Sequence, residues 1–203
     1  MSLLVLPAMV GVLVDESTLT EEQAGLAASI GFFGAAAIAF VMAFRMHSLD
    51  LRKTAIIGFV LAAAGDACSG FVADHSTLFM FIRFMTGVAG GAAYTAIVAA
   101  FARERHVDRG YGLFITLQFI VSGLGLYLVP VYSAWLSVTG MYLVFATLDV
   151  AGAILCHWLP GRASLPGRGK ALKSELKVLL ASATLLGALG FALFEAANTA
   201  QFT

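Results

Sequence analysis

Long apolar runs separated by short polar breaks make up most of this chain. At 1.5 Å per residue, a helix of about 20 residues crosses the ~30 Å hydrocarbon core of a bilayer. So many runs of this length have no soluble explanation, and each predicts a membrane-spanning helix. The runs are 23–44, 54–73, 78–102, 111–133, 139–159 and 178–203.

A shorter apolar run, residues 3–14, precedes these six. It lacks the basic start of a signal peptide, contains Pro7, and is too short to span a bilayer as a helix. It is either a re-entrant piece or the later part of a span, and it brings the predicted helices to seven.

Composition supports a membrane protein. The 203 residues are 60% hydrophobic and 12% charged, with a mean hydropathy of +0.92, whereas soluble domains carry about 25% charged residues. The formal net charge is zero, which gives no indication of a nucleic-acid partner. The sequence therefore predicts an all-α protein that crosses the membrane several times.

Cations alternate between the breaks, and this predicts the orientation. Three, three and five Lys or Arg lie in 45–53, 103–109 and 162–177, eleven of the twelve in the chain, while the intervening breaks have none. The positive-inside rule places the cation-rich breaks in the cytoplasm. Aromatic residues near the predicted helix ends are expected to form an interfacial belt: Tyr132, Trp135, Tyr142 and Trp158.

The longest break, residues 160–177, is rich in Pro, Gly and cations and is predicted to be a cytoplasmic linker. It divides the chain into a six-helix bundle over 1–159 and the start of a further bundle over 178–203. Two three-helix halves of the first bundle would have opposite topologies, which is compatible with the inverted repeats of transporters.

Three segments carry recognisable motifs. In the first, Arg83 is followed four residues later by Gly87 and then by small residues that include Gly90 and Gly91. The second, residues 109–112, reads RGYG, and the third, residues 44–53, reads FRMHSLDLRK.

These segments are similar to motifs of the N-terminal half of major facilitator superfamily transporters. The first resembles the family's helix-4 signature, the second the R-G-x-x-G that opens helix 5, and the third the loop motif G-x-x-x-D-R-x-G-R-K. Only Arg52 and Lys53 match that loop motif. The resemblance makes these two residues, together with Arg109 and Gly112, candidates for a gating role.

The resemblance implies a fold and an activity. Family members have two six-helix bundles around a central cavity and move small solutes by alternating access. The chain would then be a fragment truncated at both ends, with the missing second bundle as its partner. We expect an integral protein of the bacterial inner (plasma) membrane, with the linker and the N-terminus of the complete chain in the cytoplasm.

Arg83 is the cation that lies inside an apolar run. A charge at membrane depth costs about 2.5–3.5 kcal/mol on insertion scales, so it should contact protein or a water-filled cavity. Gly87, Gly90 and Tyr94 share its helical face within about 40°, which favours a cavity for a polar or anionic ligand. Alternatively, Arg83 extends to the interface, and Gly87, Gly90 and Gly91 serve close helix packing, with Gly87 and Gly91 as a GxxxG pair.

Two carboxylates are predicted within the membrane. Asp66 lies at a depth similar to that of Arg83, across a short turn, so the two could form a neutralising pair or a proton-coupling site. Asp149 has no cation in its own span. Desolvation of an unpaired carboxylate favours its protonated form, which makes Asp149 a candidate proton carrier.

Other polar residues share helical faces. Glu195 and Asn198, three apart in the last run, are candidate substrate or proton ligands, because the family's helix 7 lines the cavity. Gln118 is a substrate candidate too, although with Ser122 it could serve only to hydrogen bond between helices. The histidines show no metal-site spacing, and we expect no metal, no cofactor beyond a coupled proton or ion, and no catalytic residues.

The sequence thus favours part of a secondary-active transporter of a small solute. The alternative is a multi-span membrane scaffold, or a gene remnant, without transport activity. An intramembrane enzyme is disfavoured, since no nucleophile–base pair is visible.

The cation pattern gives a testable topology. We expect reporter fusions in the cation-poor breaks to lie outside the cell and those in the cation-rich breaks to lie inside. The fusion points are after Glu22, Thr77 and Ser137 for the outside, and within 45–53, 103–109 and 162–177 for the inside. A single fusion that reports the opposite side would contradict the six-span topology.

Overall fold

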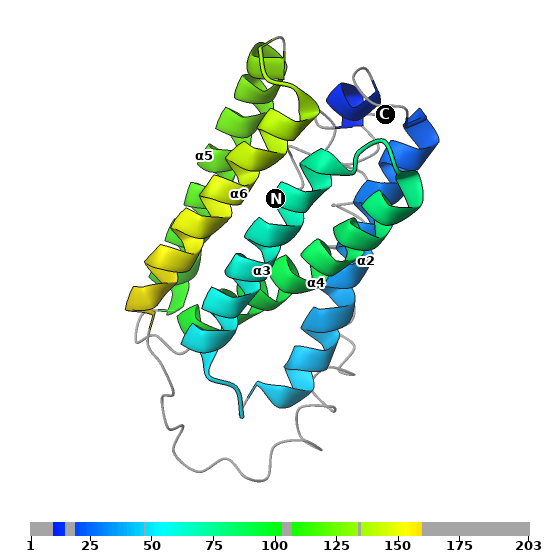
Figure 1. Ribbon diagram of the computed structural model, residues 1–203. Coiled ribbons are helices and arrows are strands. Elements are labelled where there is room, and N and C mark those ends of the chain that lie inside the picture. Colours follow the sequence, from blue (N-terminus) through cyan, green and yellow to red (C-terminus); the bar gives the residue numbers. More distant parts are fainter. Residues whose placement is uncertain (1–9, 15–18, 47, 103–106, 134, 160–203) are drawn as a thin grey trace, which may run out of the picture. The chain divides into compact units, whose positions relative to one another are not determined.

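A computed structural model of the chain describes residues 10–14, 19–46, 48–102, 107–133 and 135–159. Every element in these ranges is helical and no strand occurs in them (Figure 1). After a short helical stretch at residues 10–14, the elements are α2 (Glu21–Arg45), α3 (Leu51–Phe71), α4 (Ser76–Phe101), α5 (Val107–Ser133), α6 (Val138–Leu155) and the 3-10 turn η2 (Cys156–Trp158).

Five of these helices are long and apolar enough to cross a membrane. They coincide with five predicted runs. The chain divides into two compact units, Met1–Ala163 and Ser164–Thr203. The predicted linker (160–177) and the predicted helix over 178–203 lie outside the described residues.

Polar caps explain why three helices begin before the predicted apolar runs. Thr20 forms a capping box with Gln23 at the start of α2, and Asp50 accepts a hydrogen bond from the backbone N–H of Lys53 at the start of α3. Ser137 caps α6 in the same way. Hydropathy locates the apolar part of a helix, whereas the cap, which satisfies otherwise unpaired N–H groups, decides where the helix begins.

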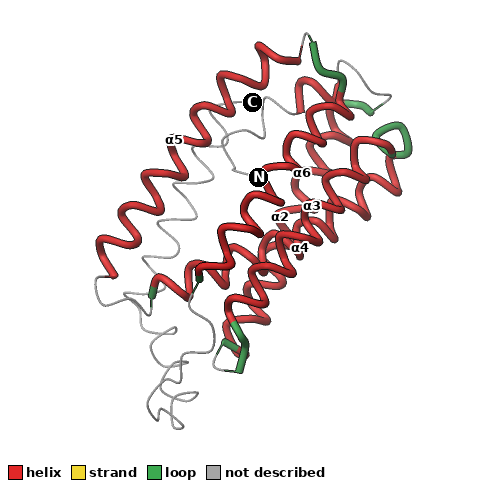
Figure 2. Tube along the Cα trace, turned by 60° about the vertical axis from the view of Figure 1, so that its left-hand side comes forward, coloured by secondary structure: helices red, strands yellow, loops and turns green. Residues whose placement is uncertain are grey.

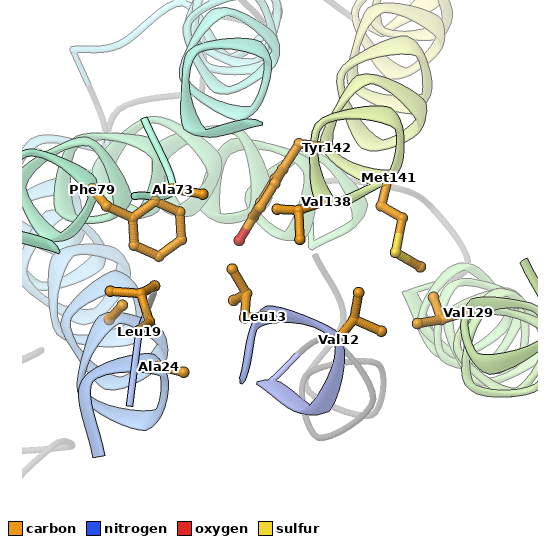
Figure 3. Close-up of a cluster of buried hydrophobic side chains, with 11 residues drawn as sticks. Val12, Leu13, Leu19, Ala24, Ala73, Phe79, Val129, Val138, Met141 and Tyr142 are labelled. Carbon is orange, nitrogen blue, oxygen red and sulfur yellow. The ribbon is translucent and has the colours of Figure 1, made fainter. Parts of the chain in front are cut away.

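The helices of the first unit pack mainly as a row in the order α2, α4, α3, α6 (Figures 1 and 2). The α5 helix contacts α4 and α6 only over short stretches. Residues 10–14 and the ends of α2 to α6 on the cation-poor side meet in one apolar cluster (Figure 3). Ends of α2, α3, α4 and η2 on the cation-rich side meet in a second. Successive helices therefore run antiparallel, as the alternating breaks predicted.

Small residues allow the helices to approach closely. A Cβ on Gly91 of α4 would lie 2.6 Å from the Cα of Ala35 in α2, and one on Gly87 would overlap the backbone of Gly31. On α3, a Cβ on Gly58 would lie 2.7 Å from the backbone oxygen of Ala89. Helices in lipid associate through such van der Waals packing. Gly87 and Gly91 therefore have the packing environment predicted for a GxxxG pair, whereas the packing role predicted for Gly90 is wrong, because no atom lies within 4 Å of a Cβ placed there.

The predicted aromatic belt is wrong for one of its members. Tyr132, Trp135 and Trp158 are exposed, as residues at a membrane–water interface would be. Tyr142 is instead buried inside the bundle, where its ring packs 6.0 Å from the ring of Phe79. Its position near a helix end predicted an interface, but α6 turns this residue toward α4.

The packing of α4 gives a prediction with a matched control. Gly87→Ala should lower the free energy of unfolding by about 1–3 kcal/mol, because the added methyl group collides with the backbone of α2. Gly90→Ala, three residues further on, has no atom within 4 Å of its new methyl group. It should change stability by no more than ~0.5 kcal/mol. Unfolding of the two variants in detergent would be compared; equal losses would contradict the packing contact.

Candidate functional site

Arg83 is held in a buried polar cluster between α3 and α4. Its Nη2 lies 2.5 Å from Asp66 Oδ1, forming an ion pair. Its Nε and Nη2 also donate to Ser69 Oγ, at 3.1 and 2.7 Å. Arg83 is only 8% exposed and Asp66 3%. The arginine therefore contacts protein rather than extending to the interface, and the predicted pair with Asp66 is present.

The local sequence explains this geometry. Asp66 and Ser69 are three residues apart, so they lie on one face of α3. The short turn between α3 and α4 makes the helices antiparallel and sets Arg83 opposite that face. Thr86, three residues after Arg83, accepts a further hydrogen bond from Nη2 at 3.3 Å. Several of the five guanidinium donors are thereby satisfied.

Aromatic rings complete the environment of the arginine. The guanidinium carbon of Arg83 lies 4.9 Å from the ring centre of Tyr142 and 5.9 Å from that of Phe79. Both rings belong to the apolar cluster of Figure 3. A desolvated cation–π contact is worth about 2 kcal/mol. Charge, hydroxyl and ring contacts thus all stabilise one cation within the membrane.

A second carboxyl group joins this cluster from α6. The side chain of Asp149 lies close enough to Asp66 and to Arg83 for electrostatic interaction with both. Two carboxyl groups therefore share the surroundings of one guanidinium. The sequence proposed Asp66 and Asp149 separately, and the fold brings them together.

The face expected to run from Arg83 to Tyr94 is divided in the structure. The side chain of Arg83 turns toward α3, and Gly87 abuts α2. Only Gly90 and Tyr94 remain on an open face, since nothing lies within 4 Å of a Cβ placed on Gly90. Arg83 and Gly87 are thereby separated from Gly90 and Tyr94.

The face of α4 that carries Gly90 and Tyr94 contacts α5 through Tyr94. The rings of Tyr94 and Phe114 have centres 5.6 Å apart. Gly90 lies one turn before Tyr94 in α4, and Gln118 lies one turn after Phe114 in α5. Because the two helices are antiparallel, Gly90 and Gln118 are at about the same level. Gln118 is half-buried, and its backbone carbonyl accepts a hydrogen bond from the hydroxyl of Ser122. The bare backbone of Gly90 and the amide of Gln118 are thus placed at one depth.

The comparisons with known proteins give one match. The family model described as Major Facilitator Superfamily matches residues 1–203, the whole chain. The chain belongs to this superfamily of membrane transporters. The searches of curated proteins and of solved structures gave no match. Because the described residues alone include five helices of membrane length, this member of the superfamily is an integral, multi-pass membrane protein.

The residues that resemble the superfamily's loop motifs lie on the cation-rich side. Arg52 donates a hydrogen bond through Nη2 to the backbone oxygen of His157, which links α3 to η2. Lys53, Arg109 and Gly112 are exposed. A gating role for these four residues stays a prediction.

Glu195 and Asn198 lie outside the described residues. In the described part of the chain, no three His, Cys, Asp or Glu side chains are placed to hold a metal. Sequence reasoning missed Ser69 and Thr86, although each lies three residues from a charged partner.

The two carboxyl groups give a second stability prediction. Asp66→Asn should lower the free energy of unfolding only slightly, because Asp149 can ionise and pair with Arg83. Asp149→Asn should also have a small effect, because it leaves the Arg83–Asp66 ion pair in place. The double variant removes both counter-ions, and its free energy of unfolding should fall by at least about 1 kcal/mol more than the sum of the two single losses. Asp108→Asn, in the first turn of α5, is the exposed control. Additive losses in detergent unfolding would contradict the shared cluster.

Proposed function

We propose that this chain supplies a six-helix bundle of a secondary-active transporter that moves a small solute by alternating access. The match of the entire chain to the superfamily model carries the proposal. In this mechanism a second bundle packs across the open side of the first, and rocking of the two exposes the solute site to each side of the membrane in turn.

The solute would bind at the open face between α4 and α5. Gly90 leaves the backbone of α4 bare, Tyr94 and Phe114 offer ring surfaces, and Gln118 offers both a donor and an acceptor. Sites for small molecules are mostly apolar with a few placed polar groups, which matches this set. Glu195 and Asn198, which lie outside the described residues, stay candidate substrate or proton ligands on the basis of the sequence.

A coupled proton would reside on the carboxyl pair. Asp66 is paired with Arg83, and Asp149 lies within electrostatic range of both. With a proton on one carboxyl group the three side chains would be neutral together, and loss of that proton would leave two carboxylates facing one guanidinium, which disfavours the present packing of α3 against α6. Proton binding and release would thus act on the helix arrangement, as a coupling step requires. The cluster can neutralise Arg83 structurally and also serve in proton coupling, because the two roles are compatible.

The transport proposal is tested on the complete gene product. A thermal-shift screen of the purified protein against small solutes would identify ligands, since a ligand that binds the folded state raises its melting temperature. Uptake of each ligand would then be measured in cells. Gly90→Leu should reduce uptake about tenfold or more, the effect of ~1.4 kcal/mol, because its side chain fills the open space. Membrane abundance should stay normal.

Two comparisons make this experiment decisive. Tyr127→Ala changes an exposed tyrosine on a different face of α5 and should leave uptake unchanged, whereas Tyr94→Ala should reduce it. For coupling, Asp66→Asn with Asp149→Asn should abolish stimulation of uptake by an imposed pH gradient. Normal uptake by Gly90→Leu would refute the binding face. No uptake of any stabilising ligand would favour the non-transporting scaffold or gene remnant.

A further inference from the structure

A groove opens between α3 and α6. It has a volume of about 460 Å³ and its walls are almost entirely apolar. Ile56 and Val60 of α3 form one wall, and Val150 and Ile154 of α6 form the other. His157 and Trp158 of η2 close the end on the cation-rich side.

The closed end of the groove carries cations. Arg52 precedes Ile56 by one helical turn, and its Nη2 donates to the backbone oxygen of His157. Its Nε is buried and has no hydrogen-bond partner among the described residues. Lys53 is exposed beside it. Trp158, also exposed, has the position and chemistry of a residue at the membrane–water interface.

We propose that this groove binds an anionic glycerophospholipid. One acyl chain lies between α3 and α6, and the phosphate-bearing headgroup lies at Arg52 and Lys53. An apolar trough with cations only at its interfacial end complements a molecule that is apolar along its length and anionic at one end. A zwitterionic lipid would fill the trough equally well but gain less from the cations. The structure therefore assigns selectivity to the headgroup end.

Bound lipid would also link two helices. Arg52 belongs to α3 and His157 to the turn that ends α6, so a phosphate at this point contacts the hydrogen-bonded bridge between them. This gives Arg52 a role at the bilayer surface, separate from the gating role that the loop motif suggested. The proposal does not depend on the solute or on the transport cycle.

The test uses the full chain in nanodiscs made from equal parts of phosphatidylglycerol and phosphatidylcholine. After mild detergent extraction, native mass spectrometry would count the retained lipids of each kind. We expect phosphatidylglycerol to be retained preferentially. Arg52→Gln with Lys53→Gln should weaken that preference by about fivefold for each cation removed. Arg45→Gln, an exposed cation on the same side at the end of α2, is the matched control and should leave it unchanged.

A second pair of variants tests the apolar part. Val60→Trp fills the groove from a half-exposed position, so it should fold normally and reduce lipid retention. Leu148→Trp, exposed on another face of α6, should not. Equal retention of the two lipids by the wild-type chain, or full phosphatidylglycerol retention by the double cation variant, would overturn the proposal. A dimer that Val60→Trp dissociates, without lipid enrichment, would assign the groove to a second copy of the chain and overturn it too.

Discussion

An arginine inside a membrane must be neutralised, and the packing of α3, α4 and α6 meets that requirement around Arg83. Desolvation disfavours an unpaired guanidinium by several kcal/mol. Here the cation has a carboxylate at 2.5 Å, a hydroxyl at 2.7 Å and an aromatic ring at 4.9 Å. The three partners come from α3 and α6, so the charge on α4 fixes the relation of three helices.

Such contacts need helices that lie close together. A side chain at Gly65 would collide with the Thr86 hydroxyl, and one at Gly70 would lie 2.9 Å from the Cα of Thr139. The hydroxyl of Thr139 donates to the Gly70 carbonyl at 2.6 Å, so the same approach also makes a hydrogen bond between helices. Small residues thus allow α3 to pack closely against α4 and α6, and the polar cluster around Arg83 fixes how the three helices are aligned along their axes.

The described helices consequently present three different environments. Between α3, α4 and α6 lies a buried polar cluster in which Arg83 is paired with Asp66. The face of Gly90 and Tyr94 is open and mixes ring surface with backbone, as a solute site would. The groove between α3 and α6 is apolar with cations at one end, a combination that is suited to lipid. One set of antiparallel helices thereby presents a buried ion pair, an open face and an apolar groove at three different places.

Sequence patterns established the spans, their alternating direction and the family resemblance, because a bilayer imposes a minimum apolar length on each helix and the loops record orientation in their cations. The turn between α3 and α4 was short enough to predict the pairing of Asp66 with Arg83. Only the tertiary structure placed Asp149 beside them, buried Tyr142, and separated Gly87 from Gly90. These outcomes depend on how far each helix is rotated about its axis. A helix that is apolar on every face has no polar side to indicate its rotation, so contacts between residues far apart in the sequence decide it.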